Sequence, residues 1–178
     1  LDVSVFSNGT PLDTLGVSNF TVYEDGVLQT DYFDVLPPAL GGGARLVDIV
    51  FLMDNSGSMG DDINAVQNNV NYFVHQLKTQ GFDYALGLCR FGASQNSGYP
   101  IIEDGGILTF DIDYFLNTLW TRNSTSGSFE PGWDALYEAA VNFSFRPGAH
   151  KVFILITDET PSCHGNKGRY TKEETISI

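Results

Sequence analysis

Three oxygen-bearing side chains stand at alternate positions directly after an apolar run in the first half of the sequence. The run covers residues 46–53 (LVDIVFLM), and Asp54, Ser56 and Ser58 follow it in the segment DNSGSM. Side chains at alternate loop positions can converge on one point, and one carboxylate with two hydroxyls supplies the hard oxygen ligands that Mg²⁺ prefers. The spacing therefore predicts a partial shell for a divalent cation, with positions left for other ligands.

Two other interpretations of this loop compete with cation binding. An EF-hand that begins at Asp54 would need Gly at its sixth position and Glu at its twelfth, where the sequence has Met59 and Ala65, so this interpretation fails. The polar residues could instead cap the helix that begins near Asp61 and interact with its dipole. Asp61 and Asp62 would be sufficient for that role, so for these two residues both interpretations stay open.

The elements around the loop alternate between strands and helices. The predicted strands cover residues 46–53, 84–91, 106–110 and 152–157, the third at an edge. The predicted helices have apolar residues at helical spacing and cover residues 63–77, 112–119 and 135–143. This order indicates an α/β fold with a doubly wound, mostly parallel sheet and helices on both faces. The Asp54 loop then lies at the carboxyl end of a central strand, where open sheets bind ligands.

The N-terminal part of the chain has a different pattern. Residues 1–36 read as short strands with turn signals at Asn8-Gly9 and Asp25-Gly26, which predicts part of an immunoglobulin-like β-sandwich. Residues 37–45 are rich in Pro and Gly and predict a linker. We expect residues 46–178 to form the α/β domain, and we expect this domain to be incomplete at its C-terminus because the last predicted central strand lies so near the end.

The charge balance narrows the classes of partner. There are 22 Asp and Glu residues against 9 Lys and Arg residues, and the formal net charge is -13. This balance argues against nucleic acid and anionic membranes as partners. It favours a secreted or cell-surface setting, where calcium and magnesium can neutralise the carboxylates. No apolar run is long enough to cross a bilayer, so we expect no direct membrane insertion of this segment.

The cysteines and histidines offer little chemistry. Cys89 lies in a predicted strand and Cys163 in a loop, and two cysteines are too few for a disulfide framework. One bridge or two free thiols both remain open. The pair Cys163-His164 supplies only two zinc donors without partners at suitable spacing, so we do not expect a zinc site.

The segment Asp54-x-Ser56-x-Ser58-Met59 resembles the metal-ion-dependent adhesion site of von Willebrand factor A domains, and the similarity covers about residues 46–160. Within that superfamily the chain is most similar to the integrin β-subunit I-like domain, because residues 128–136 (SFEPGWDAL) resemble its Ser-Pro-Glu-Gly-Gly-Phe-Asp-Ala-Ile stretch. In other A domains a Thr stands at the position of Glu130. The resemblance implies that five residues hold Mg²⁺ or Mn²⁺, namely Asp54, Ser56, Ser58, Glu130 and Asp158.

The same resemblance implies a second cation. Asp61 and Asp62 match the acids that hold a neighbouring regulatory Ca²⁺ in integrin β subunits. Charge counting supports this independently, since Asp54, Glu130 and Asp158 would place three negative charges around one divalent ion. A second cation beside the site would restore its electrophilicity.

Two features depart from the integrin pattern. The positions before Glu130 that should supply the third integrin metal site hold Thr125, Gly127 and Phe129, so we expect this third site to be absent. The loop over residues 92–105 is shorter than the specificity loop of integrin β subunits, which leaves the choice of ligand unassigned.

The N-terminal segment carries a further resemblance. Residues 20–29 (FTVYEDGVLQ) are similar to a segment that precedes A domains in many secreted bacterial proteins. Here a sandwich segment is followed by an integrin-β-like A domain. This order is similar to the arrangement in integrins, where the hybrid domain embraces the A domain that is inserted in it. Together these similarities imply a microbial integrin-β-like surface protein.

These expectations define a functional hypothesis. The chain is a non-enzymatic, metal-dependent adhesion module, and an Asp or Glu carboxylate of a protein ligand, such as a partner subunit, fills the open coordination position. One alternative is a structural domain of a surface fibre in which the metal only rigidifies the loops. Another is a metal-assisted hydrolase. Against the hydrolase, the sequence has no Ser-His-Asp arrangement, no phosphate-binding glycine loop and no His placed as a general base.

Overall fold

The computed structural model describes residues 6–7, 10–11, 19–24, 26–29, 45–160 and 168–178. The chain divides into two compact units, residues 1–45 and 46–178. The described part of the first unit forms two short antiparallel hairpins, in which β1 (Phe6–Ser7) pairs with β2 (Thr10–Pro11) and β3 (Val22–Glu24) pairs with β4 (Val27–Gln29). Their membership of a β-sandwich stays a prediction. The predicted linker lies outside the described residues except for Arg45.

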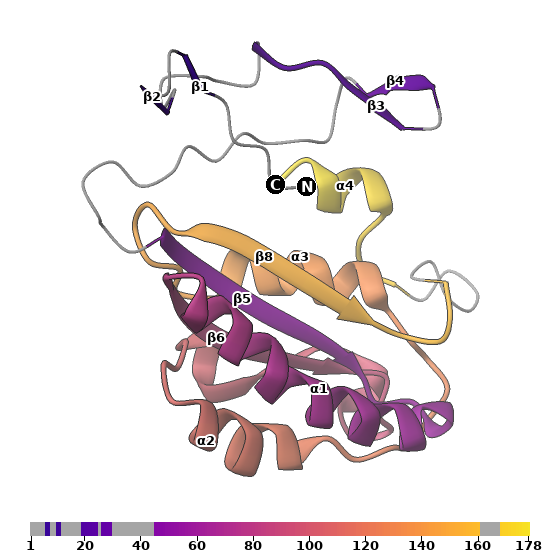
Figure 1. Ribbon diagram of the computed structural model, residues 1–178. Helices are drawn as coiled ribbons and strands as arrows, with labels where there is room; N and C mark the ends of the chain where they lie inside the picture. Colours follow the sequence, from indigo (N-terminus) through magenta and orange to yellow (C-terminus); the bar gives the residue numbers. More distant parts are fainter. Residues whose placement is uncertain (1–5, 8–9, 12–18, 25, 30–44, 161–167) are drawn as a thin grey trace. The chain divides into compact units, whose positions relative to one another are not determined.

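The second unit is built on a four-stranded sheet (Figure 1). Its strands stand in the order β7-β6-β5-β8, and their bounds are β5 (Arg45–Asp54), β6 (Phe82–Phe91), β7 (Ile101–Ile102) and β8 (His150–Ile156). Strand β5 pairs with β8 in parallel, and β7 pairs with β6 in antiparallel orientation. Asn55 N donates to Phe91 O at 2.6 Å, so the carboxyl ends of β5 and β6 lie together. The mixed, mostly parallel sheet that the sequence predicts is confirmed.

Helices pack against both faces of this sheet because β5 is apolar on both sides. The helical elements are α1 (Gly60–Thr79), α2 (Ile112–Tyr114) with the helical turns Phe115–Leu119 and Trp120–Arg122 that continue it, α3 (Gly132–Asn142) and α4 (Lys172–Ile176). Phe51 and Met53 of β5 share one core with α1 and the 112–122 segment, whereas Val50 and Leu52 share another with α3. None of the described helices is long and apolar enough to cross a membrane.

The edge of the sheet differs from the prediction. Residues 106–110 do not form a strand, and only Thr109 makes an isolated bridge, to Leu86. The edge strand is β7 at residues 101–102 instead. The chain turns sharply after it, because Asp104, Gly105 and Gly106 all have positive φ angles, of 48°, 61° and 82°. Gly106 packs tightly at this turn, since a β-carbon there would lie 2.1 Å from Asn142 O.

Cys89 lies in the middle of this sheet. It is fully buried in β6 and its thiol is free. Burial raises the pKa of the thiol, so it stays protonated and unreactive at neutral pH. The pair Cys163-His164 lies outside the described residues.

Candidate metal centre

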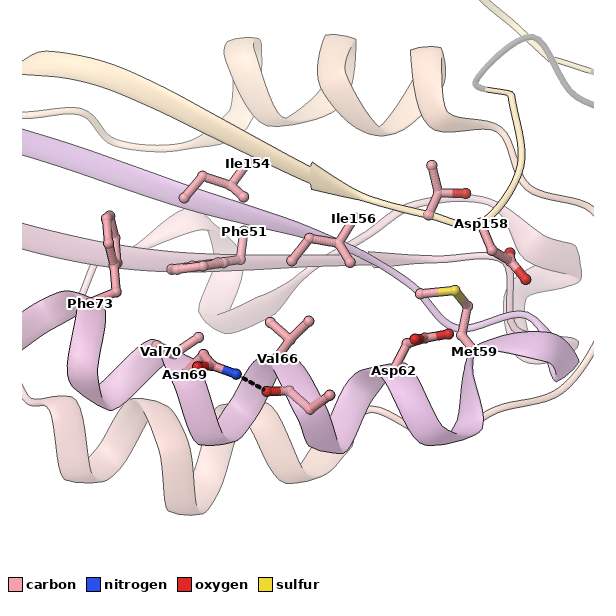
Figure 2. Close-up of a pocket in the computed structure, with 12 residues that line it drawn as sticks. Phe51, Met59, Asp62, Val66, Asn69, Val70, Phe73, Ile154, Ile156 and Asp158 are labelled. Carbon is pink, nitrogen blue, oxygen red and sulfur yellow. Dashed lines mark hydrogen bonds between the residues drawn. The ribbon is translucent and has the colours of Figure 1, made fainter. Parts of the chain in front are cut away.

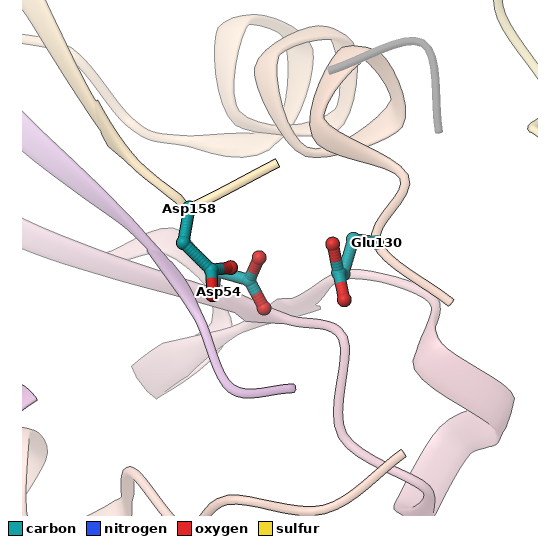
Figure 3. Close-up of side chains that lie close together, drawn as sticks. All are labelled: Asp54, Glu130 and Asp158. Atoms are coloured by element: carbon teal, nitrogen blue, oxygen red, sulfur yellow. The ribbon is translucent and has the colours of Figure 1, made fainter. Parts of the chain in front are cut away.

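Three carboxylates meet at the carboxyl end of the sheet. Asp54 is the last residue of β5, Asp158 follows β8, and Glu130 lies in the loop before α3. Each offers one carboxylate oxygen, and these oxygens all lie within 4.8 Å of one another (Figure 3). Asp54 and Glu130 are buried, whereas Asp158 is exposed. The structure thus brings together the three acids among the five residues predicted for the main cation site.

The two predicted serines lie beside these acids. Ser56 is buried, and its Oγ is 3.1 Å from Oγ of Ser58, which is exposed. The Ser56 hydroxyl also acts on the Glu130 carboxylate, because it offsets in part the rise in pKa that burial causes there. Carboxylate and hydroxyl oxygens therefore form a continuous group that begins inside the domain and ends at its surface.

The Asp54 carboxylate is held at both oxygens. Ser56 N donates to Oδ1 at 2.7 Å, and Thr157 Oγ1 donates to Oδ2 at 2.7 Å. Gly92, directly after β6, packs against the same group, since a β-carbon at this position would lie 2.5 Å from Oδ1. The sequence analysis missed Gly92 and Thr157. The signal available was their place at the ends of predicted strands: Gly92 directly follows the strand predicted at 84–91, and Thr157 is the last residue of the one predicted at 152–157.

Backbone hydrogen bonds fasten the loops of the site to one another. Ser126 N donates to Asn55 O at 2.9 Å, and Gly57 N donates to Gly127 O at 3.0 Å. Ser94 N donates to Ser126 O at 3.2 Å, which adds the loop after β6. The loop that carries Glu130 is therefore attached to the loop that carries Asp54, although the two are far apart in the sequence.

A partly buried ion cluster supports the start of the Glu130 loop. Arg90 Nε donates to Glu103 Oε1 at 2.7 Å, and Arg90 Nη1 donates to Arg122 O at 2.8 Å. Arg122 in turn pairs with Glu103 and, at 3.0 Å, with Asp104. These two arginines are committed to structural pairs.

The raised pKa values of Asp54 and Glu130 are those expected where buried acids form a cation site. Burial is the main cause that raises the pKa of Asp54, and hydrogen bonds from Ser56 and Thr157 offset it in part. Burial also raises the pKa of Glu130, and the charge of Asp54 adds to this effect. Two buried acids beside a third are stabilised in their ionised form by a positive charge. A donor set made only of oxygen atoms suits Mg²⁺, Mn²⁺ or Ca²⁺ better than zinc.

Asp61 and Asp62 are not part of the carboxylate cluster. Both are exposed in the first turn of α1, where an acid interacts well with the helix dipole. The N-cap of this helix is Met59, and no side chain caps it. Neither acid is therefore the N-cap residue of α1. The neighbouring Ca²⁺ site stays a prediction.

A groove of about 440 Å³ runs from the acids along α1 (Figure 2). Phe51, Ile154 and Ile156 of the sheet face Val66 and Val70 of α1 across it. Its polar end is formed by Asp62, Thr157 and Asp158. Asp158, the exposed acid of the cluster, and Asp62 of α1 therefore border the same groove.

Comparison with known proteins gives a family match for most of the chain. The model of the von Willebrand factor type A domain family matches residues 48–175. No curated protein sequence matches the chain. The closer similarity to integrin β subunits that the sequence suggests stays a prediction.

The chain is also similar to solved structures. The pilus adhesin SpaC from Lactobacillus rhamnosus GG, in its open conformation, is 23% identical with a TM-score of 0.52, and the match covers 66% of this chain and 15% of the adhesin. Proximal thread matrix protein 1 from the mussel byssus is 16% identical with a TM-score of 0.46, and the match covers 68% of this chain and 33% of that protein. The chain thus spans a small part of the adhesin, and the likeness concerns the fold.

Proposed function

Since the chain belongs to the von Willebrand factor type A domain family over residues 48–175, we propose that it is a metal-dependent adhesion module of a secreted or cell-surface protein. The observation that carries the proposal is the meeting of three carboxylate oxygens within 4.8 Å of one another. In this proposal Mg²⁺ or Mn²⁺ is held by Asp54, Ser56, Ser58, Glu130 and Asp158.

The ligand is an acidic group of another protein, such as a partner subunit. A divalent cation supplies an open coordination position that accepts a carboxylate oxygen. Asp54 and Glu130 are buried, so they face the ion from inside the domain. Asp158 and Ser58 are exposed, so the side of the site that they border is the side on which a ligand approaches. No catalytic step is part of this role.

Two further observations support the proposal. The solved structure with the TM-score of 0.52 is a pilus adhesin, which agrees with an adhesive role and a surface location for this chain. Glu130 stands beside Asp54, as the integrin β-like pattern requires. The proposal also includes an integrin-β-like relationship and a Ca²⁺ site at Asp61 and Asp62. It further includes a partial sandwich at residues 1–36 and a linker at residues 37–45.

Binding measurements test this function. Calorimetry with Mg²⁺, Mn²⁺ and Ca²⁺ is expected to detect cation binding, and an immobilised aspartate peptide is expected to bind the protein only when a cation is present. EDTA and Asp54→Ala should each abolish peptide binding. Asp113→Ala is a matched control, because it removes an exposed acid from a helical turn outside the cluster. Peptide binding that survives EDTA or Asp54→Ala would refute the adhesive role.

One alternative is supported by the loop contacts. Because backbone hydrogen bonds already join three loops, a cation could serve only to rigidify them in a structural domain of a surface fibre. That role predicts cation binding and a gain in stability, without affinity for any carboxylate peptide. A metal-assisted hydrolase would instead release product from an ester or phosphate substrate in a cation-dependent assay.

A further inference from the structure

A cation and two aromatic rings stack next to the Glu130 loop. The guanidinium carbon of Arg169 lies 4.0 Å from the centroid of the Tyr99 ring. The Tyr99 ring meets the Phe129 ring edge-on, with centroids 5.4 Å apart. Phe129 directly precedes Glu130, so this stack connects a positive side chain to the loop that carries one acid of the proposed metal centre.

Both ends of the stack are held in place. Arg169 N donates at 2.9 Å to both carboxylate oxygens of Asp134, and Tyr170 N donates to one of them at 3.1 Å. Asp134 is fully buried in the first turn of α3, just after Glu130. At the other end, a β-carbon at Gly98 would lie 2.6 Å from Phe129 O, so the Tyr99 loop packs directly on Phe129. Arg169 and Glu130 are thus anchored to the same helix start.

The Arg169 guanidinium is the arginine side chain that is available to a ligand at this end of the described structure. Arg90 and Arg122 are paired with Glu103. The Arg169 side chain is 53% exposed, and its ion-pair contact with Glu138 spans 3.9 Å, near the outer limit for such a pair. A guanidinium that lies with one face on an aromatic ring still presents its N–H edge, which binds carboxylates in a fork geometry.

We propose that Arg169 forms a second anion-binding contact beside the metal centre, so that the preferred ligand is a peptide segment with two acidic groups. The cation binds an oxygen of the first carboxylate, and the guanidinium on Tyr99 donates N–H hydrogen bonds to the second. This inference rests on the proposed function of the metal centre. It also explains how a chain of formal net charge -13 binds an acidic partner. The bound cation and the Arg169 guanidinium attract the peptide locally and offset its repulsion by the other acids of the chain.

The test measures the binding of synthetic peptides to the 178-residue chain at saturating Mn²⁺. One peptide has a single aspartate between glycines, and the others have a second aspartate one to four residues further along. We expect at least one two-acid peptide to bind about fivefold more tightly than the single-acid peptide. Arg169→Gln should abolish this difference. It should leave the Mn²⁺ affinity and the affinity for the single-acid peptide unchanged, and it should lower the melting temperature by no more than about 2–4 °C, because it removes one exposed contact between a cation and a ring.

Lys151→Gln is a matched control. Lys151 also lies over an aromatic ring, 4.9 Å from the centroid of Phe145, but near the amino end of β8, away from the carboxylate cluster. Its loss should not change the preference for two acids. Equal affinities for one-acid and two-acid peptides in the unaltered protein, or a preference that survives Arg169→Gln, would overturn the role of Arg169. Peptide binding that ignores EDTA would refute the metal-dependent function itself, and with it this inference.

Discussion

A β-carbon at Gly92 would lie 2.5 Å from Oδ1 of Asp54, which is closer than a β-carbon and an oxygen atom that are not covalently bonded can lie. Gly92 also has a φ of +91°. We expect Gly92→Ala to displace the Asp54 carboxylate and to lower the Mn²⁺ affinity at least tenfold. The free energy of unfolding should fall by more than the roughly 1–2 kcal/mol that the left-handed conformation alone costs. Calorimetry with Mn²⁺ and urea denaturation measure the two effects.

Gly81 provides the control for this substitution. Its φ is +80°, but a β-carbon there would have no other atom within 4 Å. Gly81→Ala should therefore show the cost of the backbone conformation alone, with the Mn²⁺ affinity unchanged. If the two variants bind Mn²⁺ equally well, close packing of Gly92 does not position Asp54.

Cation binding should stabilise the folded domain, because unfolding separates the three acids. A cation present at 100 times its dissociation constant adds about 2.7 kcal/mol, or about 5–10 °C in melting temperature for a chain of this size. Asp54→Asn should lose this gain. Burial raises the pKa of Asp54, so its ionised form is unfavourable in the folded state, and without cations the variant should be at least as stable as the unaltered protein. Thermal scans with MnCl₂ or EDTA measure both effects, and an equal Mn²⁺ gain in both proteins would contradict the assignment.

A substitution at the amino end of β5 should lower the free energy of unfolding without changing the metal site at the carboxyl end. Arg146 donates from Nε and from its backbone N to the two carboxylate oxygens of Asp48, each at 2.6 Å, and from Nη1 to Asp83 Oδ1 at 2.8 Å. Asp48 is fully buried in β5. Arg146→Met should therefore cost about 3–5 kcal/mol, since it leaves a buried charge without its partner. Urea denaturation measures this loss, and Asp48→Asn in the same chain should recover part of it.

The Mn²⁺ affinity provides the second readout for Arg146. Asp48 lies near the amino end of β5, whereas Asp54 lies at its carboxyl end. Arg146→Met should therefore bind Mn²⁺ with the affinity of the unaltered protein under conditions where it is folded. A cost below about 1 kcal/mol, or a weaker Mn²⁺ affinity in the folded variant, would show that the two ends of the sheet are not independent.

The central strands and the acids after them were predictable from local sequence. Strand β5 is buried on both faces, so it leaves an apolar run, interrupted only by Asp48, that is typical of a central strand or a buried helix. Asp54 follows that run directly. Glu130 and Asp158 came from a family resemblance instead, because nothing in their local sequence shows that three loops meet.

The contacts that depend on two distant segments could not be predicted. The edge strand was misplaced because residues 106–110 are apolar enough for a strand, whereas Gly106 packs on Asn142 and turns the chain. The clash that requires Gly92 and the stack of Arg169 on Tyr99 also arise only when separate loops pack together. A single sequence carries no local signal for such pairs.

The last prediction separates the two interpretations of Asp61 and Asp62. If these acids hold a second cation, Asp61→Ala with Asp62→Ala should remove the effect of Ca²⁺ on peptide binding while Mg²⁺ still supports binding. If they only interact with the dipole of α1, the double variant should lose about 0.3–1 kcal/mol of stability per acid and respond to Ca²⁺ as before. Glu173→Ala is the control, because Glu173 is an exposed acid in the first turn of α4. Peptide titrations with Ca²⁺ at saturating Mg²⁺ decide the question, since only a bound second cation makes the Ca²⁺ response depend on these two carboxylates.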